Sequence, residues 1–135
     1  YLPIEEMDPE KIVKVVFAAE RATLEPLTQI LPARYGDSFT FTASESYFFE
    51  MMPPDTSKGR AIRPLKELIG KQKATVFAVG DYENDLDMLR RCDVPACPSN
   101  ALEQVKRICR HHLCSNNEGA IADLIERLEQ GIIII

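Results

Sequence analysis

The strongest constraint on the fold is an alternation of helical and extended patterns in the second part of the sequence. From Ser57 onward, the expected order is helix, strand, helix, strand, helix, strand, helix. Strands that alternate with helices in this way pair in parallel, and the helices cover the faces of the resulting sheet. This region therefore predicts an α/β fold, built as half of an open, Rossmann-like parallel sheet.

Two amphipathic helices frame this region. The first is expected over residues 57–69, with Gly70 as its stop and with an inward face formed by Ile62, Leu65 and Ile69. The last is expected over residues 118–130, with an inward face formed by Ile121, Leu124, Ile125 and Leu128. Between them, the apolar patterns predict short strands at 74–80, 94–98 and 111–115 and helices at 84–91 and 101–110.

The first part of the sequence has a different pattern. Residues 11–19 carry apolar and β-branched side chains at both odd and even positions, which is typical of a strand buried on both faces. A helix is expected over residues 20–35, although Pro26 and Pro32 lie inside it. The runs SFTFTA and SYFFEMM predict two antiparallel strands with a polar turn, SES, between them. We therefore expect a βαββ unit in residues 1–52 and a separate part of an α/β sheet in residues 53–135.

Carboxylates crowd the end of one expected strand, in the stretch VGDYENDLDM. Asp81 and Asp85 are four residues apart at a strand-to-helix junction, which is where open parallel sheets place their chemistry. Converging carboxylates repel each other unless a cation lies between them, and hard oxygen ligands suit Mg²⁺. Asn84 adds an amide that can hydrogen-bond an anion. The simpler alternative is a helix whose first turn carries acidic residues because the helix dipole favours them.

A lysine in TSKG stands at the start of an expected helix, where the helix dipole disfavours positive charge. Lys58 is well placed there if an anion binds between its ammonium group and the helix N–H groups. The alternative is an ordinary solvated lysine. Lys58 lies one helix and one strand before the carboxylate cluster. An anion site at the lysine and a magnesium site at the carboxylates therefore make each other more credible.

Composition excludes several classes of function. The formal net charge is −5 and the isoelectric point is about 5.1, which disfavours nucleic-acid binding because phosphate contacts need clustered Lys and Arg. No apolar run approaches the roughly 18 to 20 residues of a membrane span, and no secretory signal pattern opens the sequence. We expect no membrane partner. The run IIII at 132–135 has no evident role and could pair as an edge strand or form an apolar tail.

Four cysteines leave a zinc site as an open alternative, since CRHHLC places two of them around two histidines. They are Cys92, Cys97, Cys109 and Cys114. Structural zinc ligands more often stand on turns at shorter spacing, whereas these cysteines lie within apolar periodic segments. We expect free, buried thiols in a cytoplasmic protein.

The sequence resembles the C-terminal half of a haloacid dehalogenase-superfamily phosphatase of the Cof type, which carries a C2 cap. The matching segments are DTSKGRAI, FAVGDYENDLDMLRRC, PACPSNALEQVKRIC and SNNEGAIADLIERL. They cover residues 57–128, and GDxxND followed by LxM, with SKG upstream, is the most specific part. Residues 11–52 are similar to the last βαββ unit of that cap.

The resemblance implies roles for individual residues. Lys58 is expected to bind the transferring phosphoryl group and to steady the nucleophile, and Asn84 to contact the phosphate. Asp81 is expected to ligate Mg²⁺, with Asp85 supporting the metal directly or through water. The loops PSNA and SNNEG correspond to rim positions rather than catalytic ones.

The sequence departs from the family at the attacking group. The family takes its nucleophile and its acid/base aspartate from a DxDGT segment on the first strand, and these 135 residues contain none. DLD, at 85–87, lies on the expected helix instead. The resemblance thus implies a Mg²⁺-dependent hydrolase that acts on small phosphorylated metabolites through an aspartyl-phosphate. It also implies that this chain is inactive until an N-terminal half or a second chain completes the site. A non-catalytic module that pairs with another chain is the alternative.

Overall fold

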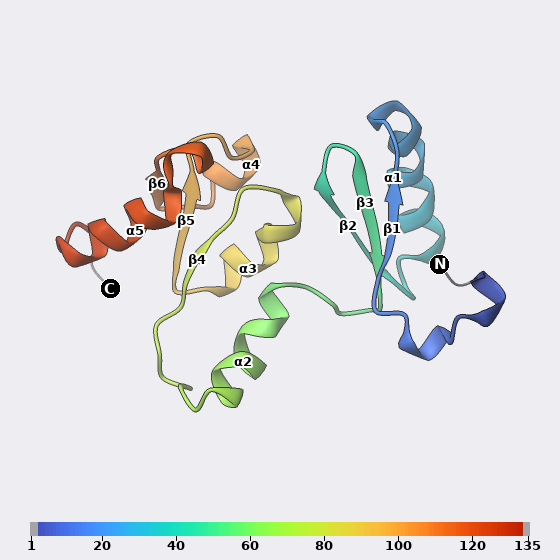
Figure 1. Ribbon diagram of the computed structural model, residues 1–135, viewed down its shortest axis with the longest axis horizontal. Helices are drawn as coiled ribbons and strands as arrows, with labels where there is room; N and C mark the ends of the chain where they lie inside the picture. The colour runs from blue at the N-terminus through green and yellow to red at the C-terminus, as the bar shows by residue number, and fades with distance from the viewer. Residues whose placement is uncertain (1–2, 134–135) are drawn as a thin grey trace. The chain divides into compact units, whose positions relative to one another are not determined.

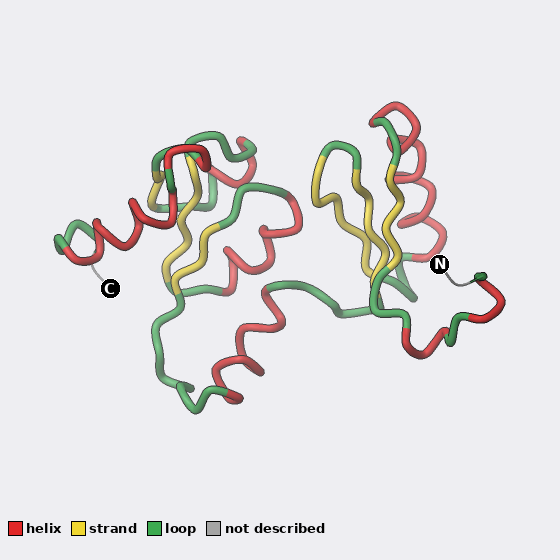
Figure 2. The backbone as a smooth tube through the Cα atoms, in the orientation of Figure 1, coloured by secondary structure: helices red, strands yellow, loops and turns green. Residues whose placement is uncertain are grey.

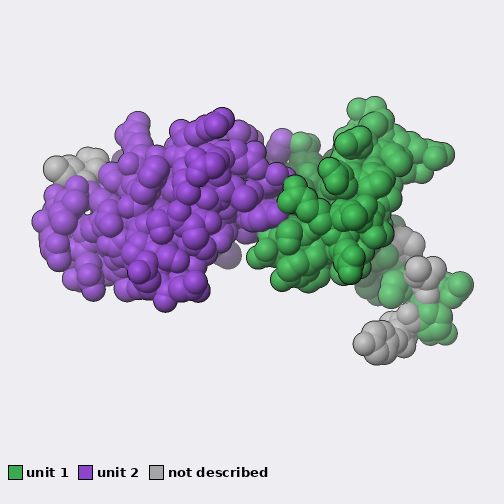
Figure 3. All heavy atoms as spheres, turned by 90° about the horizontal axis from the view of Figure 1, so that it is seen from above, with its two compact units in different colours: residues 1–56 green, residues 57–135 purple. Residues whose placement is uncertain are grey.

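The computed structural model describes residues 3–133, which fall into two compact units with the boundary after Thr56 (Figure 3). The expected boundary lay four residues earlier, between 52 and 53, because the sequence pattern locates the end of the last strand and not the connection that follows it. None of the described helices is long and apolar enough to cross a bilayer.

The first unit is an antiparallel sheet with one long helix (Figures 1 and 2). The sheet order is β1-β3-β2, and the elements follow one another as the expected βαββ unit. After two 3-10 turns, Ile4–Glu6 and Pro9–Lys11, its elements are β1 (Val15–Ala18), α1 (Arg21–Tyr35), β2 (Thr40–Glu45) and β3 (Phe48–Met52). The hairpin turn lies at residues 46–47, slightly later than SES predicts, and α1 continues through both prolines.

Aromatic rings form the core of this unit. Phe49 is 4% exposed, and its ring lies 5.8 Å from that of Phe41 and 6.3 Å from that of Phe17, one from each neighbouring strand. Leu24 of α1 is also buried. Because side chains alternate along a strand, the three rings share one face of the sheet.

The second unit contains a parallel sheet, which confirms the α/β prediction (Figure 1). The sheet order is β4-β5-β6, with β5 in the middle. The strands are β4 (Phe77–Val79), β5 (Val94–Pro98) and β6 (His111–Leu113). The helices are α2 (Ile62–Leu68), α3 (Leu86–Arg91), α4 (Glu103–Lys106) and α5 (Ala120–Glu129), and the 3-10 turns are η3 (Gly59–Ala61), η4 (Glu83–Asp85) and η5 (Asn116–Glu118).

Helices cover both faces of this sheet, as the alternation of elements predicts. On one face, Ala78 and Cys97 pack with Leu89 of α3 and Val105 of α4. The other face carries α5, and its cluster is formed by Val94, Ala96, Leu113, Ala120, Leu124 and Ile133. Ile133 therefore belongs to the core, whereas Ile132 is exposed and residues 134–135 lie outside the described part.

The expected inward faces of two helices are only partly buried. In α2, Leu65 is 55% exposed and Ile69, just after the helix, is 56% exposed; in α5, Ile121 and Ile125 are 57% and 50% exposed. The prediction for α2 was wrong for Leu65 and Ile69. The prediction for α5 was right for Leu124 and Leu128, which pack in the core, and wrong for Ile121 and Ile125. An apolar stripe marks the face that is available for packing and does not specify what covers it. Helix α4 is also shorter than expected, with four residues in place of ten.

Candidate active site

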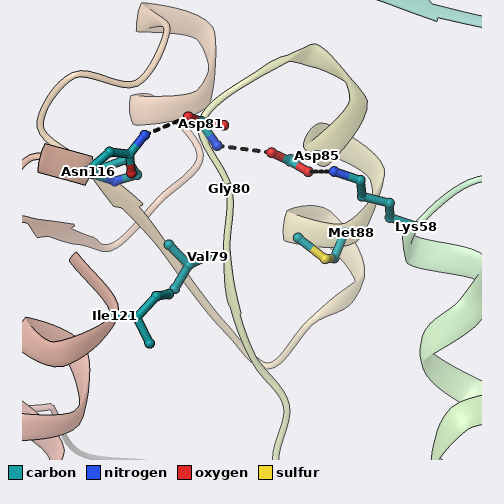
Figure 4. A pocket seen from close by; sticks show the side chains of 9 residues that line it. Lys58, Val79, Gly80, Asp81, Asp85, Met88, Asn116 and Ile121 are labelled. Atoms are coloured by element: carbon teal, nitrogen blue, oxygen red, sulfur yellow. Dashed lines mark hydrogen bonds and ion pairs between the residues drawn. The ribbon is translucent and has the colours of Figure 1, made fainter. Parts of the chain in front are cut away.

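A pocket of about 360 Å³ opens beyond the carboxyl end of β4, and all its lining residues belong to the second unit (Figure 4). They come from the carboxyl ends of β4 and β5, from the turn after β4, from η4 and η5, from α3 and α5, and from the turn before η3. The lining residues are Lys58, Val79, Gly80, Asp81, Asp85, Met88, Pro98, Asn116 and Ile121. This is the edge of the sheet at which the sequence placed the chemistry.

Asp85 organises the turn that follows β4. Its side chain is nearly buried, and its Oδ2 accepts hydrogen bonds from the backbone N–H groups of Asp81 at 3.0 Å and Tyr82 at 3.4 Å. The side chain of Asp85 therefore holds the backbone of Asp81 in place. Gly80 is needed for a steric reason, because a Cβ there would lie within 2.8 Å of the Asp85 Cγ.

Lys58 reaches the same carboxylate from the other side. Its Nζ lies 2.5 Å from Asp85 Oδ1, and its side chain remains half exposed at the pocket wall. Asp85 thus bridges a cationic group and the backbone of Asp81 (Figure 4). The structure brings Lys58 and Asp81 to one pocket, and it provides a positive group beside a carboxylate that faces the same cavity.

Asn116 completes this group, and the sequence did not identify it. Its Nδ2 donates to Asp81 Oδ2 at 2.8 Å, while its backbone N–H donates to Asn100 Oδ1 at 3.0 Å. Of the two loops expected at the rim, SNNEG therefore contacts Asp81 directly through Asn116, and PSNA supports that contact indirectly through Asn100. A signal was available: each loop follows a strand of the parallel sheet and carries an amide at the carboxyl end of that strand.

Asn84 lies on η4, next to Asp85, and is half-buried. It is not among the residues that line the pocket in the described part of the chain. Its expected contact with a phosphate stays a prediction.

Of the two aspartates expected to bind magnesium, only Asp81 has an oxygen without a hydrogen-bond partner among the described contacts. Carboxylate oxygens are the ligands Mg²⁺ prefers, and Asn116 engages only one oxygen of Asp81. Asp85 is occupied on both oxygens by Lys58 and by backbone N–H groups. Within residues 3–133, no group of three or more His, Cys, Asp or Glu side chains could hold a metal. Asp81 is therefore the residue of this pair that is placed to ligate, and further ligands have to come from elsewhere.

The positions of the cysteines argue against a shared zinc site. All four thiols are free, and burial raises the pKa of Cys109 to about 12. Cys97 and Cys109 pack in the cluster beneath α3 and α4, whereas Cys114 packs with the cluster on the opposite face. His112, between them in sequence, contacts the Lys106 carbonyl at 3.1 Å. The residues of CRHHLC thus diverge to two sides of the sheet.

Comparison with known proteins agrees with this geometry. A family model described as haloacid dehalogenase-like hydrolase matches residues 1–125. This chain belongs to that family.

The relatives of the chain carry the same assignment. It is 31% identical over 127 residues to M6_Spy0533 of Streptococcus pyogenes serotype M6, a protein named as a phosphatase; the match covers 94% of this chain and 47% of that protein. A haloacid dehalogenase-like hydrolase from Bacteroides thetaiotaomicron superposes with a TM-score of 0.72 at 28% identity, over 93% of this chain and 47% of the other.

A HAD/COF-like hydrolase from Plasmodium vivax has the same fold. Its TM-score is 0.79 at 21% identity, over 88% of this chain and 42% of that one. The chain thus spans about half the length of the relatives it matches. The resemblance to haloacid dehalogenase-superfamily phosphatases is confirmed, and it concerns one half of such a protein.

Proposed function

We propose that this chain supplies the metal-binding and phosphate-binding half of a Mg²⁺-dependent phosphate-monoester hydrolase that acts on small phosphorylated metabolites. The observation that supports it most is the meeting of Lys58 and Asp81 in one pocket, linked through Asp85. Family membership makes phosphoryl chemistry the expectation for such a pocket.

Each residue has a role in this proposal. The Lys58 ammonium group binds the phosphoryl oxygens and holds the attacking carboxylate in place, and Asp85 orients that ammonium group. Asp81 ligates Mg²⁺, and Asn116 fixes the rotation of its carboxylate. Asn84 contacts the phosphate. When it is bound, the metal neutralises charge on the transferring group.

The attacking group has to be supplied from outside these 135 residues. In aspartyl-phosphate chemistry, a carboxylate oxygen bonds to phosphorus while the bond to the alcohol oxygen breaks, and an acid gives that oxygen a proton. Among the described residues that line the pocket, no carboxylate is free for in-line attack: Asp85 is engaged on both oxygens, and this proposal assigns Asp81 to the metal. We therefore expect no turnover from this chain alone, and completion of the site by an N-terminal half or a second chain.

The test is hydrolysis of p-nitrophenyl phosphate with Mg²⁺ by the 135-residue chain, compared with a protein that also carries a DxDGT-containing N-terminal half. Activity is expected only in the second case, and Lys58→Ala should reduce kcat by about 10²-fold or more, since a positioned charge contributes that much to catalysis. Turnover by the short chain that Asp81→Ala abolishes would show that the site is already complete.

A non-catalytic module that pairs with another chain is the second candidate, because β4 is an edge strand and some apolar residues of α2 and α5 are exposed, namely Leu65, Leu68, Ile121 and Ile125. Its signature is a stable complex without turnover, even when the partner carries a DxDGT segment. Free, buried thiols also fit a reducing compartment such as the cytoplasm.

A further inference from the structure

Ser57, the residue before Lys58, connects the turn around Lys58 to helix α3. Its hydroxyl donates to Asp87 Oδ2 and accepts a hydrogen bond from the backbone N–H of Arg60 at 3.1 Å. Ser57 and Asp87 are 30 residues apart in sequence. Because the hydroxyl both donates and accepts, it fixes the turn on each side of the lysine.

Gly59, the residue after Lys58, lies directly against the same aspartate. A Cβ at this position would stand 2.5 Å from Asp87 Oδ2 and 2.6 Å from its backbone carbonyl oxygen. Gly59 is itself buried. The two neighbours of Lys58 in sequence are therefore both held against Asp87.

Asp87 is a charged anchor for this contact. Its Oδ1 lies 2.7 Å from Arg91 Nε. Partial burial alone raises the pKa of the Asp87 carboxyl. The hydrogen bond from Ser57 and the interactions with Arg91 outweigh that effect, and the pKa falls below its ordinary value. The carboxylate thus stays ionised at neutral pH and accepts from Ser57 as an anion.

The segment 57–59 is consequently joined twice to the segment that contains Asp85 and Asp87. Lys58 bonds to Asp85 at its tip, and its backbone is held to Asp87 through Ser57 and Gly59. A half-exposed lysine with four rotatable bonds is otherwise mobile, so a fixed backbone limits where its ammonium group can lie. An ordinary i,i+4 surface pair between Asp87 and Arg91 would have no such effect.

We propose that Asp87, acting through Ser57, is a positioning residue that sets the location of the Lys58 ammonium group and thereby the affinity of the pocket for a phosphate group. This inference rests on the proposed function, which assigns phosphate binding to Lys58. Neither Ser57 nor Asp87 lines the pocket, so the effect must pass through the lysine.

Inorganic phosphate binding to the 135-residue chain, measured by ³¹P NMR, tests the proposal. Asp87→Asn and Ser57→Ala should each weaken binding about fivefold, the equivalent of one ordinary hydrogen bond. Ser57→Thr keeps the hydroxyl and should restore binding to within about twofold of the unmodified chain. The double variant Lys58→Ala/Asp87→Asn should bind no more weakly than Lys58→Ala, because Asp87 acts only through Lys58.

The matched control is Asp123→Asn, which removes another aspartate paired with an arginine four residues later, on α5. It should lower the melting temperature without changing phosphate affinity. A second measurement is independent of phosphate: the Lys58 side-chain ¹⁵N–H signal, which slow exchange makes visible while the ion pair with Asp85 holds, should broaden in Asp87→Asn and not in Asp123→Asn.

The outcomes distinguish the positioning role of Asp87 from the proposed function. If Lys58→Ala abolishes phosphate binding while Asp87→Asn and Ser57→Ala leave binding and the Lys58 signal unchanged, the positioning role is wrong and the proposed function stands. Equal losses in the Asp87→Asn and Asp123→Asn variants would also overturn positioning, because they would report stability alone. Phosphate binding that does not depend on Lys58 would refute the proposed function, and an unchanged Lys58 signal in Asp87→Asn would still decide against positioning.

Discussion

At Gly80 the backbone passes close to the Asp85 side chain. The Asp85 side chain packs against the Gly80 Cα, and this contact lets Asp85 Oδ2 reach the N–H groups of the strand-end turn. The sequence indicated a glycine that permits a tight turn. The structure shows that its role is clearance, since Gly80 is absent from the positive-φ residues among those described.

Replacing Gly80 with alanine should therefore damage the site as well as the fold. We expect a loss of about 1–3 kcal/mol of unfolding free energy, the usual cost of overpacking, and weaker phosphate binding because Asp85 must move away from Lys58. Urea denaturation and phosphate titration measure the two effects.

The control for this prediction is Gly70→Ala. Gly70 has a φ of +67° and open space around its Cα, so alanine there should cost about 1 kcal/mol through backbone strain alone. Phosphate affinity should be unchanged in this variant. A Gly80→Ala chain with unaltered phosphate binding would contradict the role given to Asp85.

At the scale of elements, α5 is fastened to the end of β6 by polar contacts as well as by its apolar face. Asp123 Oδ2 accepts from the backbone N–H of Cys114 at 2.7 Å, and Arg127 pairs with Asp123 and donates to the His112 carbonyl at 3.0 Å. Leu124 packs into the sheet between them. The helix is thus held in register with the end of β6.

This contact should make stability depend on pH. The bond from Arg127, followed by that from the Cys114 N–H, holds the pKa of Asp123 below its ordinary value of 3.8. A lowered folded-state pKa stabilises the fold above the unfolded-state value, and the benefit is lost as pH falls through the folded-state value. The difference in unfolding free energy between the unmodified chain and Asp123→Asn should therefore be constant near neutral pH and shrink below pH 3.8.

Denaturation series at several pH values measure this difference. Glu126→Gln, which alters an exposed carboxylate on the same helix, is the comparison variant. A gap between the unmodified chain and Asp123→Asn that persists undiminished at pH 2 would contradict the linkage.

At the scale of the whole molecule, the second unit exposes apolar residues on two of its helices while β4 remains at the edge of its sheet. Leu65, Leu68 and Ile69 stand three and four positions apart, and Leu68 is 84% exposed. Grouped apolar surface of this kind marks a contact site or promotes association.

The isolated chain should accordingly associate at high concentration, and the double variant Leu65→Glu/Leu68→Glu should reduce that association. Because both side chains are exposed, each change should alter the unfolding free energy by only about 0.5 kcal/mol or less. Light scattering across a concentration series measures the mass. The pair Arg63→Gln/Lys66→Gln on the same helix shifts the net charge by the same two units and therefore controls for the change in charge. Equal loss of association in both pairs would assign the effect to charge.

The sequence by itself determined the class of the fold, the parallel sheet of the second unit, and the convergence of Lys58 and Asp81. Periodicity, glycine stops and motif spacing are local properties, and parallel strands necessarily bring their carboxyl ends to one edge. Tertiary structure alone decided the other features. The loop after β6 could be expected near Asp81, but which of its amides bonds to Asp81 across 35 residues was decided by the tertiary structure. Asp87 meets Ser57 across 30 residues, a contact that no local pattern encodes. Which apolar stripes are buried was also decided there, since burial depends on what packs against a helix and not on its own periodicity.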